Sequence, residues 1–88
     1  MSTILITYDL KSPGKDYSRL YEHIKGLGVW WHYMESTWIV KTEKSVDDIA
    51  NSTRLVLDPN DYLLVVDISN SKKNGWLPGD AWNWINYT

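Results

Sequence analysis

The segment TILITYDL, residues 3–10, is a dense run of β-branched and aromatic side chains that predicts a central strand buried on both faces of a sheet. Side chains alternate along a strand, so Ile6 and Tyr8 point to one face and Asp9 to the other. The turn residues SPG at 12–14 then end the strand, because they favour a reversal of the chain and proline has no amide to donate.

The sequence after this segment predicts two helices and three further strands. Apolar residues recur every three or four positions over residues 17–27, which predicts a helix that Asp16 caps and Gly28 ends. Ser45 predicts the start of a second helix, over residues 46–57, because its hydroxyl can accept a hydrogen bond from the amide three residues on. The other strands are expected at residues 29–34 (VWWHYM), 37–42 (TWIVKT) and 62–68 (YLLVVDI).

This order of strand, helix, strand, strand, helix and strand predicts the α+β class. It is typical of a ferredoxin-like βαββαβ sandwich, a four-stranded sheet with two helices on one face. Right-handed crossovers place the first and third strands in the middle of that sheet. We expect residues 1–68 to form this domain. Residues 69–88 would add a polar loop and a tryptophan-rich tail that packs on the domain or on a second protomer.

The composition is that of a globular chain of 88 residues, 43% hydrophobic and 23% charged. The absence of cysteine excludes disulfides and thiolate zinc sites. Nine lysines and arginines against eleven aspartates and glutamates leave a net charge of −2, which argues against a protein that coats nucleic acid with a basic face. No apolar run approaches the ~20 residues of a membrane helix, and no signal peptide is recognisable, so we expect a cytoplasmic protein without membrane association.

The predicted strands are apolar on both faces, whereas two helices cover only one of them. Burial of a large apolar side chain stabilises a protein by about 1.5–3 kcal/mol, and large apolar patches are rarely left in water. A twofold dimer is the commonest oligomer among soluble proteins. We therefore expect a homodimer, with the tail contributing to the covered surface.

Several short stretches resemble known families. The strand end YDL at 8–10, Gly28 and the strand pair containing Tyr33 and ES at 35–36 resemble the small CRISPR-associated nuclease that partners the spacer integrase, and also the virulence-associated D proteins. The nearest look-alikes are small uncharacterised bacterial proteins labelled as the SinR family, similar in two stretches, WWHYMESTWIVKT at 30–42 and DPND at 58–61. The resemblance spans about residues 3–68.

The resemblance to the nuclease family implies a ferredoxin-like homodimer whose first strand closes with an acidic residue near the twofold axis. Asp9 occupies the position of that residue in this sequence. Tyr8 also matches the family, although less specifically than Asp9. Two copies of Asp9 would hold a divalent metal, Mg²⁺, for phosphodiester cleavage, as in an endoribonuclease. The chain departs from the family where KSPGK at 11–15 replaces the usual arginines, and this departure argues against nucleic acid as a partner.

The aromatic content is unusual, with six tryptophans, six tyrosines and no phenylalanine. Tyr8, Trp31, Tyr33 and Trp38 are the candidate binding residues. Tryptophan and tyrosine rings on a strand can stack nucleobases, at about 1–3 kcal/mol per base. Alternatively, such rings form a dimer core and pack against the tail, where a large contact area and a polar atom are both useful. We favour the second interpretation because few basic residues stand nearby to neutralise phosphates.

The other polar residues have structural alternatives to a catalytic role. Asp9 is also compatible with accepting hydrogen bonds from the amides of the following turn. Asp67 either joins Asp9 in an acidic cluster or discourages aggregation as an exposed edge charge, and we favour the edge charge. His32 lacks an evident partner for general-base chemistry, so we expect a structural histidine. We expect His23 to face solvent.

Three functions stay open at this point. The first is a metal-dependent endonuclease that uses Asp9 from both protomers. The second is a non-catalytic dimeric module of the same fold that holds a partner protein, which the acidic balance and the missing arginines favour. The third is a small-molecule or nucleotide binder with a tryptophan-lined pocket under the tail.

Overall fold

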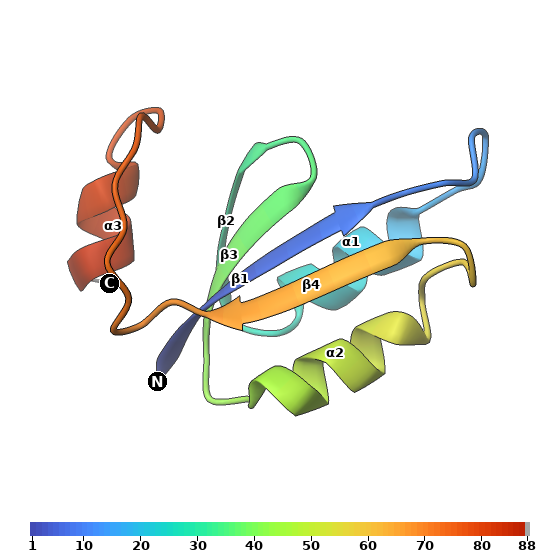
Figure 1. The fold of residues 1–88 in the computed structure, drawn as a ribbon, viewed down its shortest axis with the longest axis horizontal. Helices are drawn as coiled ribbons and strands as arrows, with labels where there is room; N and C mark the ends of the chain where they lie inside the picture. Colours follow the sequence, from blue (N-terminus) through green and yellow to red (C-terminus); the bar gives the residue numbers. More distant parts are fainter. Residues whose placement is uncertain (88) are drawn as a thin grey trace.

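The computed structural model describes residues 1–87, which form a four-stranded antiparallel sheet and three helices (Figure 1). The predicted α+β class is therefore confirmed. The strands are β1 (Ser2–Asp9), β2 (Val29–Met34), β3 (Thr37–Thr42) and β4 (Tyr62–Asp67). The helices are α1 (Ser18–Lys25), α2 (Val46–Arg54) and α3 (Ala81–Tyr87). Within the described residues, none of these helices has the length and apolar character that crossing a membrane requires.

The sheet runs in the order β2-β3-β1-β4, so β1 and β3 lie in the middle and β2 and β4 form the edges. β1 pairs antiparallel with both neighbours, which places Leu5 between Ile39 of β3 and Val66 of β4. β2 pairs antiparallel with β3, and the register of this pair shifts between Trp31 and Met34. Irregularities of this kind re-aim side chains on edge strands.

The main hydrophobic core lies between the sheet and helices α1 and α2, which occupy the same side of the sheet (Figure 1). Leu20 and Ile24 lie four residues apart on α1, so they share one helix face, and both are fully buried. Ile49 of α2 and Ile6 of β1 are fully buried in the same cluster. The apolar spacing of the two helices therefore determines which of their faces meets the sheet.

The start of α2 agrees with the sequence more closely than the start of α1. Ser45 precedes α2, and its hydroxyl accepts a hydrogen bond of 3.1 Å from the Asp48 amide, which confirms the predicted cap. The predicted cap of α1 is wrong, because the N-cap is Tyr17 and its side chain makes no capping hydrogen bond. Asp16 lies one residue earlier, and its carboxylate accepts a hydrogen bond of 2.9 Å from the amide of Ser18, the first residue of the helix. Polar side chains thus satisfy amides that have no partner within either helix.

The predicted end of α1 is wrong. The helix ends at Lys25 with Gly26 as its C-cap, so Gly28 is not the C-terminal glycine. Gly28 instead lies where the chain enters β2, and a Cβ atom there would collide with the carbonyl oxygen of Lys41 on β3. The close approach of a neighbouring strand, rather than a helix end, therefore explains this glycine.

The opposite face of the sheet carries a second, smaller cluster made with α3. Ala81 and Ile85 of α3 are buried against Trp31 of β2 and Ile39 of β3. Lys41 of β3 lies beside them, and its ammonium donates a hydrogen bond to the Ile85 carbonyl oxygen. In Figure 1, α3 stands apart from α1 and α2, at the β2 side of the sheet. The end of the chain thus covers the β2–β3 half of this face.

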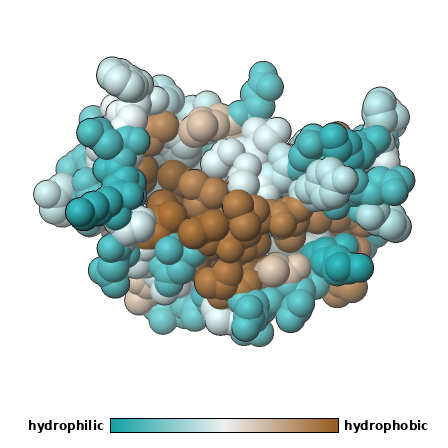
Figure 2. All heavy atoms as spheres, viewed as in Figure 1, coloured by the Kyte–Doolittle hydropathy of each residue, from teal (hydrophilic) through white to brown (hydrophobic). Residues whose placement is uncertain are grey.

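The β1–β4 half of the same face stays open to solvent. Tyr62, Leu64 and Val66 alternate along β4 and are 67%, 58% and 37% exposed. Val66 pairs with the half-buried Leu5 of β1. Figure 2 shows a hydrophobic band across the middle of this view, over β1 and β4. We call these four side chains, Leu5, Tyr62, Leu64 and Val66, the open face.

Candidate functional site

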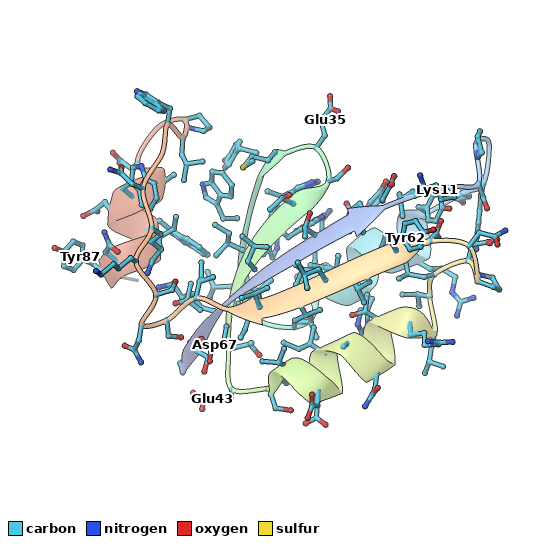
Figure 3. All side chains as sticks on the ribbon, in the orientation of Figure 1. Lys11, Glu35, Glu43, Tyr62, Asp67 and Tyr87 are labelled. Atoms are coloured by element: carbon cyan, nitrogen blue, oxygen red, sulfur yellow. The ribbon has the colours of Figure 1, made fainter. Side chains whose placement is uncertain are left out.

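Asp9 ends β1 at the border of the open face, opposite Tyr62 of β4. Its exposed carboxylate forms an ion pair of 2.8 Å with the Lys11 ammonium, and this contact raises the pKa of Lys11. The same ammonium lies 5.6 Å from the centre of the Tyr62 ring, and Figure 3 shows Lys11 and Tyr62 together at this end of the sheet. Within one copy of the chain, the carboxylate of Asp9 is therefore paired with the ammonium of Lys11. Among residues 1–87, no group of three or more His, Cys, Asp or Glu side chains is arranged to hold a metal ion.

Asp61 fixes the loop beside Asp9, a role that the sequence signals only as part of a turn. One of its carboxylate oxygens accepts hydrogen bonds from the Lys11 amide (2.7 Å) and the Tyr17 hydroxyl (3.0 Å). The other accepts from the Asp58 amide (2.8 Å). Burial opposes the ionisation of Asp61, but these hydrogen bonds outweigh it and lower the pKa of its carboxyl group. Asp61 thus holds the segment that carries Lys11 in place.

Asp67 does not join Asp9 in an acidic cluster. It pairs with Ile4 near the start of β1, whereas Asp9 ends that strand. The Ser69 hydroxyl and amide donate to its carboxylate at 2.6 Å and 2.9 Å, and these hydrogen bonds lower the pKa of Asp67. The exposed position at the end of β4 is that of an edge charge, and Figure 3 shows Asp67 at the opposite end of β4 from Tyr62.

The four candidate binding aromatics lie in pairs on opposite faces of the sheet. Tyr8 and Trp38 belong to the main core, 6% and 1% exposed, and the Trp38 indole donates a hydrogen bond of 2.9 Å to the Tyr8 hydroxyl. Burial raises the pKa of Tyr8. Trp31 and Tyr33 lie on the other face, with ring centres 5.4 Å apart. The structure does not bring all four rings into one site, and of the four only Tyr33 is exposed, since Trp31 is buried against α3.

The two histidines both make structural contacts. The ring of His32 stacks on Trp38 with centres 3.7 Å apart, and its Nε2 lies 3.2 Å from the Glu35 carbonyl oxygen. The prediction that His23 faces solvent is wrong. Its Nε2 lies 3.1 Å from the Thr53 hydroxyl and 3.2 Å from the Ser52 hydroxyl, so it bridges α1 to α2. Burial lowers the pKa of His23, and the positive charge of Lys44 lowers it further.

A pocket of about 340 Å³ opens beside Trp31 and Tyr33, where the chain enters α3. Trp84 and Asp80 also line it, and the sequence did not single out either residue as a site. Ala81 and Ile85 are four residues apart and indicate a helix, but nothing local in the sequence shows where that helix docks. The docking of α3 on β2 and β3 creates this pocket.

No protein-family model matches the chain, and no curated protein matches it either. The family resemblance therefore rests on the short stretches quoted above, and the activity it implies stays a prediction.

Proposed function

We propose that the chain is a homodimeric interaction module of ferredoxin-like architecture whose two copies meet over the open face. The order of the elements and the sheet order β2-β3-β1-β4 support this architecture. The observation that carries the proposal is the row of exposed side chains Tyr62, Leu64 and Val66 on a strand face that no element of the chain covers within residues 1–87.

The size of the open face suits self-association. Burial of one large apolar side chain contributes about 1.5–3 kcal/mol, and a twofold contact buries the same patch from both copies. Association costs ~4–15 kcal/mol in lost freedom and ordered side chains, and burial of up to four such side chains from each copy can exceed that cost. We therefore expect dimers that form at micromolar concentrations and dissociate on dilution.

The border of the open face is polar, as in most protein interfaces. Asp9 and Lys11 form an exposed ion pair at one end of it. An apolar centre with a charged pair at its border fits a specific contact between copies better than unspecific aggregation.

Light scattering on the purified protein tests this proposal directly. Leu64→Glu places a charge in the middle of the open face and should yield a 10.3 kDa monomer with unchanged secondary structure. Leu55→Glu is the matched control, because Leu55 is 81% exposed after α2 and outside the open face, and this variant should still dimerise. A wild-type protein that is monomeric at micromolar concentration would contradict the proposal. A different protein that co-purifies with the wild type but not with Leu64→Glu would also contradict it, because that protein would then occupy the open face.

A second candidate function is metal-dependent cleavage of nucleic acid, the activity that the family resemblance implies. The observation that favours it is the place of Asp9 at the border of the open face, opposite Tyr62. Two copies that meet over this face with their Asp9 ends together would bring two carboxylates near one axis, and carboxylate oxygens are the ligands that Mg²⁺ prefers. A metal there would have to displace Lys11 from Asp9, and it would polarise a phosphate and activate water.

Cleavage of RNA and DNA oligonucleotides with and without Mg²⁺ separates the two candidates. Asp9→Asn should abolish any metal-dependent turnover by the dimer, whereas the control Asp67→Asn should retain it, because Asp67 lies at the far end of the sheet. Dimerisation without metal-dependent turnover would support the interaction module and exclude the nuclease. Full activity of Asp9→Asn would remove Asp9 from the mechanism.

A further inference from the structure

The pocket beside α3 is built from elements that are distant in the sequence. Trp31 and Tyr33 come from β2, and Trp84 comes from α3. Its volume of about 340 Å³ lies at the lower end of the range for small-molecule sites. The pocket is lined mainly by apolar atoms, and it lies on the half of the sheet face that the proposed dimer contact does not use.

The aromatic rings form walls that meet at an angle. Trp31 and Tyr33 have ring centres 5.4 Å apart and planes inclined by 64°. Trp31 is only 5% exposed and packs against Ile85, so the core fixes one wall. Tyr33 is 73% exposed, so the second wall stands in solvent on one side and can adjust to a ligand.

The third ring already contacts a cation within the protein. The ammonium of Lys41 lies 5.5 Å from the centre of the Trp84 ring, a distance typical of a cation–π contact. That ammonium is buried and donates its hydrogen bond to the Ile85 carbonyl oxygen, and Lys41 does not line the pocket.

The charge of the lining selects the kind of ligand. Asp80 is the one charged residue among those that line the pocket, and within residues 1–87 no ion pair engages its carboxylate. A phosphate would meet this negative charge without a lining cation to balance it. A neutral apolar ligand would leave the carboxylate unused. A cation with an apolar surface would use both the rings and the carboxylate.

We propose that this pocket binds a small organic cation of the alkylated ammonium type, with the cationic group between the rings of Trp31, Tyr33 and Trp84 and next to Asp80. Aromatic rings that surround a quaternary ammonium ion are a general solution for this chemistry, since the ring faces attract the charge while the methyl groups gain apolar contact. This inference is independent of the proposed dimer.

Titration with choline tests the proposal, followed through the indole N–H signals of the ¹⁵N-labelled protein. The signals of Trp31 and Trp84 should shift in a saturable manner, while that of the buried Trp38 on the opposite face should stay in place. The neutral carbon isostere 3,3-dimethyl-1-butanol should bind at least tenfold more weakly. Equal binding of the isostere, or no saturable shift with choline at millimolar concentrations, would overturn the proposal.

Two variants and a matched control locate the site. Asp80→Asn and Tyr33→Leu should each raise the dissociation constant for choline about tenfold or more, and both positions are exposed, so the fold should persist. Tyr62→Leu removes an exposed tyrosine from the open face and should leave choline binding unchanged. Equal dissociation constants for choline in the wild type and both pocket variants would overturn the proposal. It would also be overturned if adenosine monophosphate shifted the indole signals of Trp31 and Trp84 with a lower dissociation constant than choline.

Discussion

The two faces of the sheet are covered in different ways. On one face, α1 and α2 connect successive strands, so the topology holds them against the sheet at both ends, and Ile24 and Ile49 are fully buried there. On the other face, α3 follows β4 and does not connect two strands of the sheet, and among residues 1–87 its cluster contains four buried residues. The comparison teaches that helices which connect two strands bury the face of the sheet that they cross more completely. Elsewhere the cover depends on a few side chains.

The largest expected effect is on the helix-covered face. Ile24→Ala removes a fully buried side chain from the main core and should lower the free energy of unfolding by about 2–5 kcal/mol. Leu55→Ala, at an 81% exposed position, should change it by less than ~0.5 kcal/mol. Urea unfolding followed by circular dichroism measures both. Similar losses in the two variants would show that burial in this core is not the main source of stability.

A smaller effect is expected on the face that α3 covers. Ile85→Ala should lower the free energy of unfolding by about 2 kcal/mol or less, because a cluster of few buried side chains can relax around the missing atoms. Hydrogen exchange should accelerate in α3 and leave α1 and α2 unchanged, since local opening follows local contacts. Equal acceleration in all three helices would mean that both faces unfold together, and the contrast between them would disappear.

The smallest effect is a pH dependence within the helix-covered face. The pKa of His23 is lowered in the folded state, so its contribution to stability is complete above the unfolded value of about 6.5. This contribution is lost as the pH falls from that value through the folded pKa. His23→Gln should reduce the loss of stability between about pH 7 and pH 5 by less than ~1 kcal/mol, because the ring is only half-buried. A steeper loss in His23→Gln than in the wild type would contradict this sign.

Features determined by local sequence could be predicted. The alternating and continuous apolar runs correctly predicted all four strands, with bounds within one residue or so of those observed. Ser45 could be identified as a helix cap because the hydrogen bond it forms spans only three residues. Asp9 could be placed near the end of β1 because the turn residues SPG follow at 12–14.

Features determined by distant contacts could not be predicted. The role of Gly28 depends on the carbonyl group of Lys41, which reaches it only through the pairing of β2 with β3. Helical spacing alone predicts that His23 faces solvent, and this is wrong because its partners lie on the second helix, α2. The pocket required knowledge of where α3 docks, so Trp84 could not be distinguished from the other tail tryptophans.

The buried amine of Lys41 gives the chain a built-in report on its last helix. Its exposed fraction is 6%, and both the burial and the charge of Lys73 lower its pKa. Its ammonium donates a hydrogen bond to a carbonyl oxygen of α3, so we expect acylating reagents to react with it faster when that helix lifts from the sheet. The rate of acylation of Lys41 would therefore report how often α3 opens, without any engineered probe.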